Sequence, residues 1–549
     1  MPRSASSPRT SSACWAEPMA TPAEMARPFA ATAPRPPLGL GNAASVRQGR
    51  IACALLVLGS LALLQFNVHH GLSVTPDSTR YMGISPIPYD APVYHWMLVL
   101  PHALGVPLLT AAMAWAIVTL CTNVVMIFAL LRRAAGDWRH AAVGTALVAL
   151  APQFVALHAS VISEPPFISF VLFTLWFVLD YFEHGRQRDL VIASLMLGMA
   201  TLARFTAPPL GAAIVLVLLT TPRLPLARRV ADSVLMAVPG AALFFGWVIL
   251  STLTVGHSIG REMRFYGNMG PAQWRANLET TAAWLFPDNV PLAFRVSLLV
   301  LLLGFAGWQF ARQLAAWRNE RADAPSDART ALSLVLGLFF VGYLAFVWLS
   351  TMLEANLSFV GRYGLPAYLV LAMLLTLQAS GLDRRLAAPR AMWFALAALA
   401  AVILASHTVR TVSRTHDAYR EGSGFHARIW RESPTIAAVR ALPAASLVYS
   451  NGPEVVTLLT DRRAGMVPME RLLRTNRPDP NDPPEAQIAR IRGEAAAWPE
   501  RPVYVVAFDN IDWRFYLASE NRLRRALSLV PVASFADGRI YRVSPAVQP

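Results

Sequence analysis

The sequence has 549 residues, of which 55% are hydrophobic, and its mean hydropathy is +0.42. A soluble protein of this length usually divides into several cores and stays closer to half apolar. Here the apolar residues form long blocks, which favours an integral membrane protein. The net charge of +15 comes from 48 basic and 33 acidic residues; in a membrane protein such an excess belongs more often to cytoplasmic loops than to a nucleic-acid surface, so we expect no nucleic-acid partner.

The N-terminal segment, residues 1–48, is rich in Ala, Pro, Ser and Arg and shows no apolar period. Such a composition predicts a disordered tail, which we expect in the cytoplasm. The first apolar block, Ile51–Phe66, lies too far from the start for an ordinary signal peptide, so we interpret it as an uncleaved first span.

Ten more apolar blocks follow and predict a mainly α-helical bundle of about eleven spans within residues 49–410. Several blocks are shorter than the ~20 residues that a spanning helix needs, and the two on either side of Arg204 would also fit a re-entrant hairpin. The blocks are Leu108–Leu131, Ala141–His158, Phe167–Phe182, Leu190–Ala203, Pro208–Thr221, Val230–Val255, Val296–Arg312, Ala331–Met352, Tyr363–Leu377 and Met392–Val409.

The charges of the connecting loops predict the orientation. With a cytoplasmic N-terminus, the inner loops hold 17 arginines and the outer loops hold 7. Because cytoplasmic loops are enriched in basic residues, we expect a multi-pass protein of the inner (plasma) membrane with its N-terminus in the cytoplasm. An odd number of spans then puts the C-terminus in the periplasm. The three cysteines offer neither a disulfide framework nor a thiolate metal site.

Residues 411–549 change in character and predict a small soluble α/β domain on the periplasmic side. Apolar runs bounded by turn residues predict strands at Ser446–Ser450, Pro502–Phe508, Val530–Phe535 and Arg539–Val543, with a hairpin turn between the last two. Helices are expected at Pro434–Leu442, Pro453–Thr460 and Pro484–Ala497.

The first outer connection, roughly residues 67–106, is long and rich in Pro and Tyr, and connections of this length are often functional. Within it, Asp77 is the leading catalytic candidate. A partly desolvated carboxylate at a membrane cavity can act as a general base, whereas the alternative is that Asp77 only caps a short helix. Asp90 fits a turn better than it fits catalysis.

The other outer turns also carry charged residues. Glu164 opens a helix, where the helix dipole favours a carboxylate even without a function. Arg204 can bind a phosphate through its planar guanidinium or extend to the membrane surface, and the same alternatives hold for Arg362. Arg261 and Arg264 lie in the segment Gly256–Arg295, parts of which predict an amphipathic interfacial helix or a belt of aromatic anchors.

Motifs for the common cofactors do not occur. The sequence has no Walker loop, no dinucleotide-binding glycine pattern and no metalloprotease motif, and the vicinal pair His69 and His70 is a weak metal signal. We therefore expect no cofactor, and no divalent metal is supported.

Four passages together resemble the membrane-embedded C-type glycosyltransferase superfamily, and more narrowly its protein-mannosyltransferase and aminoarabinose-transferase-like branch. They are PDSTRY at residues 76–81 with APVYHWML at 91–98, SEPPF at 163–167, LARFTA at 202–207 and GRYGLP at 361–366. The C-terminal segment is similar to the soluble domain of that branch at residues 448–451, 458–462 and 535–541. Each passage is short, but their order and spacing agree over most of residues 51–543.

The resemblance implies a polyprenyl-phosphate-linked sugar as donor, with the lipid in the bilayer and the sugar at the outer surface. It implies that Asp77 is the base that activates the acceptor hydroxyl. Arg204 and Arg362, with Arg261 or Arg264, would hold the leaving phosphate. Tyr81 would bind substrate, and Glu164 would line the cavity or help to hold the acceptor.

The sequence departs from the family at two places. Ser78 follows Asp77 where several members have a second acidic residue, which argues against a metal ion bound by this loop. The Pro-Pro-Tyr-rich stretch of relatives is reduced to APVY at residues 91–94, which leaves the acceptor open among lipid, glycan and protein.

We therefore expect an inverting glycosyltransferase that moves a sugar from a polyprenyl-phosphate carrier to a periplasmic acceptor. Two other classes of protein remain as alternatives. A multi-pass transporter would show repeat symmetry between its halves and broken helices at mid-membrane. A non-catalytic membrane scaffold with a partner-binding outer domain would not depend on Asp77 or Arg204.

Overall fold

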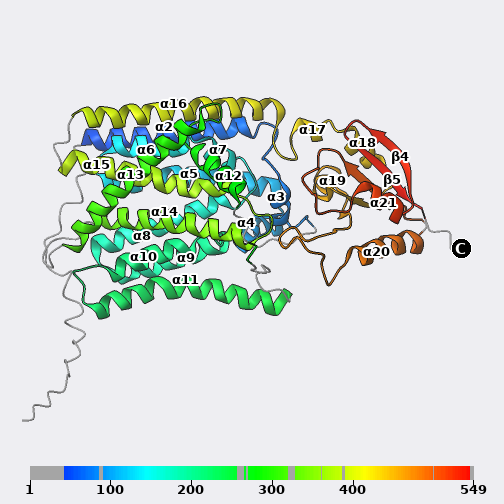
Figure 1. Cartoon of the computed structure of the whole chain (residues 1–549), viewed down its shortest axis with the longest axis horizontal. Helices are drawn as coiled ribbons and strands as arrows, with labels where there is room; N and C mark the ends of the chain where they lie inside the picture. Colours follow the sequence, from blue (N-terminus) through cyan, green and yellow to red (C-terminus); the bar gives the residue numbers. More distant parts are fainter. Residues whose placement is uncertain are drawn as a thin grey trace, which may run out of the picture.

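The computed structural model describes residues 43–85, 91–255, 265–266, 270–319, 328–359, 361–385, 390–498 and 500–544. Its long helices lie side by side in one bundle, and a smaller domain with a β-sheet lies at one end of that bundle (Figure 1). The mainly helical fold with a small C-terminal α/β domain is the predicted class.

Eight helices in the described part of the chain are long and apolar enough to span a membrane. They are α2 (Ala43–Asn67), α5 (Leu108–Ala135), α8 (Glu164–His184), α11 (Leu226–Val255), α13 (Leu292–Arg318), α14 (Ala328–Leu353), α15 (Gly361–Arg385) and α16 (Arg390–Glu421). Helix α2 begins at Ala43, inside the segment predicted to be a tail; residues 1–42 lie outside the described residues.

The remaining predicted spans are shorter or bent. Helices α6 (Trp138–Ala149) and α7 (Pro152–His158) form a ninth crossing if they are counted as one span, and they meet at an angle of 67°. Pro152 causes this break, because a proline has no N–H to continue the helical hydrogen bonds and disfavours helix at the residue before it. The α9 (Gln187–Ala203) and α10 (Pro208–Leu219) helices are too short to pass the same test. The described residues thus hold eight or nine candidate spans, roughly in line with the predicted count of about eleven.

Arg204 lies in the short connection between α9 and α10. It is the C-cap of α9 in an extended conformation, and Pro208 begins α10 four residues after it. The two helices do not form an isolated hairpin, since α9 packs mainly on α8 and α11 whereas α10 packs on α14 and α11. The connection thereby holds Arg204 at the end of the bundle, near the start of α8.

The connection between α2 and α5 contains two further helices, α3 (Pro76–Tyr81) and α4 (Pro92–Ala103). Single β-bridges fix the chain just before α3 on both sides: Ser73 pairs with Ser160, ahead of α8, and Val74 pairs with Gly424, after α16. These contacts bring three segments that are remote in sequence to the end of the bundle beside the C-terminal domain (Figure 1).

The C-terminal domain is built on a five-stranded sheet in the order β2-β1-β3-β5-β4. The parallel strands are β1 (Leu447–Ser450), β2 (Ala464–Met466) and β3 (Val503–Phe508), while β4 (Leu529–Phe535) and β5 (Gly538–Val543) form an antiparallel hairpin next to β3. The domain's helices are α17 (Arg428–Arg431), α18 (Pro434–Ala441), α19 (Pro453–Thr460), α20 (Pro484–Ala497) and α21 (Glu520–Ala526). The four predicted strands and three predicted helices are confirmed to within a residue or two at each end.

Helix α12 (Pro271–Ala282) is a separate short helix between α11 and α13. Most of its side chains are exposed, and it packs on α13 and α15. It belongs to the segment predicted as an interfacial helix, but Arg261 and Arg264 lie outside the described residues.

Candidate active site

Asp77 lies in the first turn of α3, and the local sequence accounts for that position. Thr75 is the N-cap: its side chain accepts a hydrogen bond from the Ser78 backbone N–H, and the Ser78 hydroxyl accepts one from the Thr75 backbone N–H. Pro76 occupies the first helical position, where its missing N–H costs nothing. The alternative that Asp77 is the helix cap is therefore wrong, and its carboxylate is left to make other contacts.

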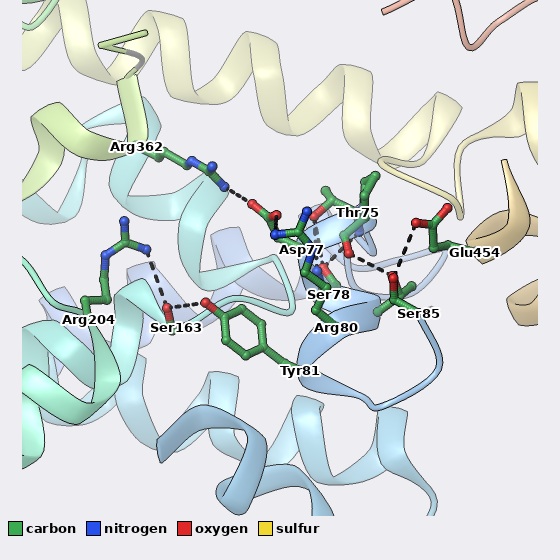
Figure 2. A network of polar contacts seen from close by, with 12 residues as sticks. Thr75, Asp77, Ser78, Arg80, Tyr81, Ser85, Ser163, Arg204, Arg362 and Glu454 are labelled. Carbon is green, nitrogen blue, oxygen red and sulfur yellow. Dashed lines mark hydrogen bonds and ion pairs between the residues drawn. The ribbon is translucent and has the colours of Figure 1, made fainter. Parts of the chain in front are cut away.

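The Asp77 carboxylate is paired with two arginines. Arg362, in the first turn of α15, donates a short hydrogen bond to Asp77 Oδ2, and Arg80 Nη1 lies 3.6 Å from Asp77 Oδ1. Figure 2 shows the side chains of Asp77 and Arg362 pointing toward each other from different elements. About a third of each of these two side chains remains accessible, 32% and 33%, so a substrate can reach the pair.

The environment of Asp77 keeps its carboxyl group ionised. Burial alone would raise its pKa, but the charges of Arg362 and Arg80 and the hydrogen bond from Arg362 outweigh burial, so the pKa lies below its ordinary value. The charge of Arg204 acts in the same direction, which puts Arg204 within electrostatic reach of Asp77.

A second ion pair lies deeper in the same place. Arg204 Nη1 lies 2.7 Å from Glu164 Oε1, and the side chains are only 13% and 2% exposed. Glu164 is in the first turn of α8, where the helix dipole also favours its charge. A buried carboxylate with so little water depends on its cation, so Glu164 and Arg204 act as a unit.

Tyr363 lies between the two ion pairs. Its ring is 5.0 Å from the guanidinium carbon of Arg362 and 5.4 Å from that of Arg204, both cation–π distances. Its hydroxyl oxygen accepts a hydrogen bond of 3.1 Å from Arg362. Tyr363 was not predicted as a site residue, although it lies in the GRYGLP passage. Its place in the site follows from three-dimensional contacts for which the sequence carries no signal.

A chain of hydroxyl groups completes the cluster. The Tyr81 hydroxyl lies 3.0 Å from Ser163 Oγ, and Ser163 Oγ accepts a long hydrogen bond of 3.5 Å from Arg204 (Figure 2). Burial raises the pKa of Tyr81 to about 12, so its hydroxyl keeps its proton. Ser163 is a second residue that sequence reasoning left without a role, although it directly precedes Glu164.

Two buried nitrogen atoms in the cluster have no hydrogen-bond acceptor among the described residues. They are the Nε atoms of Arg80 and Arg204. Buried N–H donors are nearly always paired, so these two are available to a bound acceptor. Glu164 Oε1 also lacks a hydrogen-bond partner, although it lies 2.7 Å from Arg204 Nη1.

The structure brings together five of the seven predicted site residues, namely Asp77, Tyr81, Glu164, Arg204 and Arg362. The other two, Arg261 and Arg264, and also Asp90, lie outside the described residues. Within the described part of the chain, no group of three His, Cys, Asp or Glu side chains could hold a metal ion. The expectation that the protein needs no cofactor remains a prediction.

Part of the chain matches a known protein family. Residues 89–250 match the family described as dolichyl-phosphate-mannose-protein mannosyltransferase. None of the curated proteins matches the chain.

Several solved structures are similar to this one. ArnT from Cupriavidus metallidurans in the apo state is 15% identical with a TM-score of 0.54, and the match covers 91% of this chain and 99% of ArnT. The same ArnT bound to undecaprenyl phosphate is 15% identical, with a TM-score of 0.44, over 90% of this chain and 98% of that one. The oligosaccharyltransferase AglB from Archaeoglobus fulgidus, in complex with an inhibitory peptide and a dolichol-phosphate, is 13% identical with a TM-score of 0.48. That match covers 91% of this chain and 75% of AglB.

The match to apo ArnT extends over nearly the whole of both chains and shows a common fold, and the family match covers the segment that contains Glu164 and Arg204. The chain therefore shares the fold of ArnT, and 162 of its 549 residues match the mannosyltransferase family.

Proposed function

We propose that the protein transfers a sugar from a polyprenyl-phosphate carrier to an acceptor hydroxyl on the periplasmic side of the membrane, with Asp77 as the general base. The observation that carries this proposal is the pairing of the accessible Asp77 carboxylate with Arg362, beside the buried Arg204–Glu164 pair. A base and an anion-binding group thus lie in one cluster of polar side chains (Figure 2).

The chemistry needs both kinds of group. Asp77 takes the proton of the acceptor hydroxyl, whose oxygen attacks the anomeric carbon while the bond from that carbon to the phosphate oxygen breaks. The phosphate leaves with the bonding electron pair, and Arg362 and Arg204 stabilise its growing negative charge. Attack opposite to the leaving group inverts the anomeric configuration.

The contact between Asp77 and Arg362 couples the base to donor binding. In the described structure Arg362 holds the Asp77 carboxylate, which makes it a weak base. The donor phosphodiester offers Arg362 a competing anionic acceptor, and its phosphate gains a second negative charge as it leaves. The loss of the Arg362 hydrogen bond raises the proton affinity of Asp77. The base therefore gains strength only when the donor is in place.

The donor class rests on two features. The family that matches residues 89–250 carries dolichyl-phosphate-mannose in its description. The phosphate of such a donor fits the unpaired N–H groups of Arg80 and Arg204, and its lipid fits a site at the end of apolar helices. The acceptor is a lipid, glycan or protein.

The periplasmic location rests on charge and topology. The predicted inner loops carry 17 arginines against 7 in the outer loops, and the Asp77 cluster lies at the same end of the bundle as the C-terminal domain (Figure 1). A cytoplasmic N-terminus and an odd number of crossings, such as the nine counted with the bent pair, support a periplasmic location for both.

A transfer assay on detergent-purified protein tests the proposal. A polyprenyl-phosphate sugar is supplied with an envelope extract as acceptor, and labelled product is counted. Asp77→Asn keeps the shape of the side chain but cannot accept the proton, so we expect transfer to fall about 100-fold or more. Asp417→Asn, at an exposed position near the end of α16, is the matched control. Near-normal transfer by Asp77→Asn would rule out this base, and a non-catalytic scaffold would show no transfer in any variant.

A further inference from the structure

A cavity separate from the Asp77 cluster lies between the ends of several helices. Its volume is about 830 Å³, within the ~300–1,000 Å³ range of ligand pockets. Helices α7, α12, α13, α15 and α16 contribute its lining, which includes Trp284, Arg295, Leu365, Tyr368, Arg410 and Arg414.

The first turn of α15 separates this cavity from the proposed active site. Gly361 lines the cavity, whereas the next residue, Arg362, binds Asp77. Gly361 also packs closely against Gln153, another lining residue, since a Cβ at Gly361 would be 3.3 Å from Gln153 Oε1. The two sites are therefore neighbours with different walls.

Four arginines line the cavity, and only two of them have a carboxylate partner. Arg275 pairs with Glu279 at 2.9 Å, and Arg295 Nη1 pairs with Asp288 at 2.6 Å. Arg410 and Arg414, one turn apart on α16, form no ion pair with any described residue. The lining therefore carries two uncompensated positive charges.

Buried N–H groups of these arginines also lack acceptors. Arg410 donates a hydrogen bond of 2.8 Å from Nη2 to the carbonyl of Ala283, but its Nη1 is buried and has no acceptor among the described residues. Arg295 is 4% exposed, and its Nε is also buried without an acceptor among the described residues. An arginine that merely extends to the membrane surface would have its nitrogen atoms in water, which is not the case here.

Apolar and aromatic side chains form the remaining walls. Leu365 and Tyr368 on α15 are 2% and 6% exposed, and Trp284 follows α12. Arg414 is one of the exposed lining residues, and it lies on α16, an outer helix of the bundle. An anion with a short apolar part attached fits this combination better than a fully hydrated ion does.

We propose that this cavity binds a phosphate-bearing ligand, the headgroup of an anionic lipid or free phosphate, through Arg410 and Arg414. Guanidinium groups suit phosphate because their planar N–H pairs match two phosphate oxygens. The site is independent of the proposed transfer reaction, since none of its arginines contacts the Asp77 cluster.

Binding to the detergent-purified full chain tests the proposal, with dihexanoyl phosphatidic acid and inorganic phosphate as the two probes. We expect saturable binding of the lipid, with the Kd raised about tenfold by Arg410→Gln and again by the additional change Arg414→Gln. Arg420→Gln, on the same helix but outside the cavity lining, should leave the Kd unchanged. A thermal melt confirms that each variant is folded.

Two more variants distinguish the possible outcomes. Ala276→Trp adds bulk at the cavity lining without changing its charge. Loss of lipid binding with retained phosphate binding in this variant supports a lipid-headgroup site. Equal binding of both probes by the native chain and by Ala276→Trp supports a site for free phosphate. Arg362→Gln should leave binding intact, which separates this site from the active site. Unchanged affinity in Arg410→Gln/Arg414→Gln, or failure of both probes to bind the native chain, would overturn the proposal.

Discussion

Arg362 and Asp77 are 285 residues apart in the chain, yet the guanidinium of one donates directly to the carboxylate of the other. The contact joins the first turn of α3 to the first turn of α15, and both turns lie at the end of the bundle beside the C-terminal domain (Figures 1 and 2). Because Arg80 adds a second positive charge, Asp77 is ionised before any substrate binds.

The decrease of kcat/KM at acid pH, the acid limb of its pH profile, depends on the ionisation of Asp77 beside Arg362. With its pKa held below the ordinary value of ~3.9, Asp77 stays ionised throughout the neutral range, and the native protein should lose kcat/KM only at lower pH. Arg362→Gln removes the main opposing charge, burial then raises the pKa of Asp77, and the acid limb should move to higher pH.

Arg80→Gln is the matched comparison for that experiment. Arg80 lies farther from the carboxylate, at 3.6 Å, and makes no hydrogen bond to it, so its removal should move the limb less than the removal of Arg362 does. An identical acid limb in the native protein and in Arg362→Gln would show that a group other than Asp77 limits the reaction.

The Glu164–Arg204 pair predicts a separation of stability from activity. Arg204→Gln leaves the 2% exposed Glu164 carboxylate without its cation, which typically costs about 3–5 kcal/mol. The double variant Glu164→Gln/Arg204→Gln removes both charges and should recover most of the lost stability. Both variants should remain poor transferases because both lack the guanidinium.

Melting curves in detergent and the transfer assay together check this expectation. If the double variant melted as early as Arg204→Gln, the buried charge would not be the cause of the loss. If its transfer rate also returned to normal, Arg204 would have only a structural role.

Much of the fold can be predicted from periodicity and composition, whereas the contacts of the site cannot. The predicted bounds of α19 and α20 agree with the structure. Pro453 and Pro484 mark their starts, because proline is favoured at the first position of a helix. Strand β2 was missed since its three residues are too few to show a period. The block Ala141–His158 was predicted as one span although Pro152 divides it.

The site was predictable only as separate pieces. Single charged residues at outer turns indicated Asp77, Glu164, Arg204 and Arg362, but their pairing depends on helix packing over hundreds of residues. The place of Tyr363 between two guanidinium groups has no sequence signal at all, since an aromatic residue at the end of a span is ordinary in membrane proteins.

Gly424 holds the segment before α3 in place, which gives a further prediction. Its φ is +58°, and an added Cβ would lie 2.3 Å from the carbonyl oxygen of Val74. Gly424→Ala therefore meets both backbone strain and a backbone clash, and it should break the bridge to Val74, two residues before Pro76. Transfer should fall although the substituted residue touches no substrate.

Gly493→Ala is the control for Gly424→Ala. Gly493 lies inside α20 with nothing within 4 Å of an added Cβ, so alanine there should stabilise the helix by about 1 kcal/mol and leave transfer unchanged. Hydrogen exchange of residues 73–81 would show directly whether Gly424→Ala loosens the segment. Native exchange rates in that variant would contradict the proposed role.

The buried pair Glu454–Arg514 links the C-terminal domain to the same region. Both oxygen atoms of Glu454 accept hydrogen bonds of 2.8 Å from Arg514 Nη2, and the two side chains are 1% and 2% exposed. Glu454 Oε1 also accepts a hydrogen bond of 3.4 Å from Ser85 Oγ, in the connection that follows α3 (Figure 2). Glu454→Gln removes the charge that compensates Arg514 and should destabilise the domain by about 3–5 kcal/mol.

Limited proteolysis checks this last expectation, because a loosened C-terminal domain is cut faster than the membrane-embedded helices. The exposed pair Glu485–Arg522 supplies the control: Glu485 is 75% exposed, and pairs of that kind contribute little, so Glu485→Gln should be cut at the native rate. Since Ser85 ties the domain to the connection that carries Asp77, Glu454→Gln should also lower transfer. Fast cleavage with full transfer would mean that the domain does not position the catalytic loop.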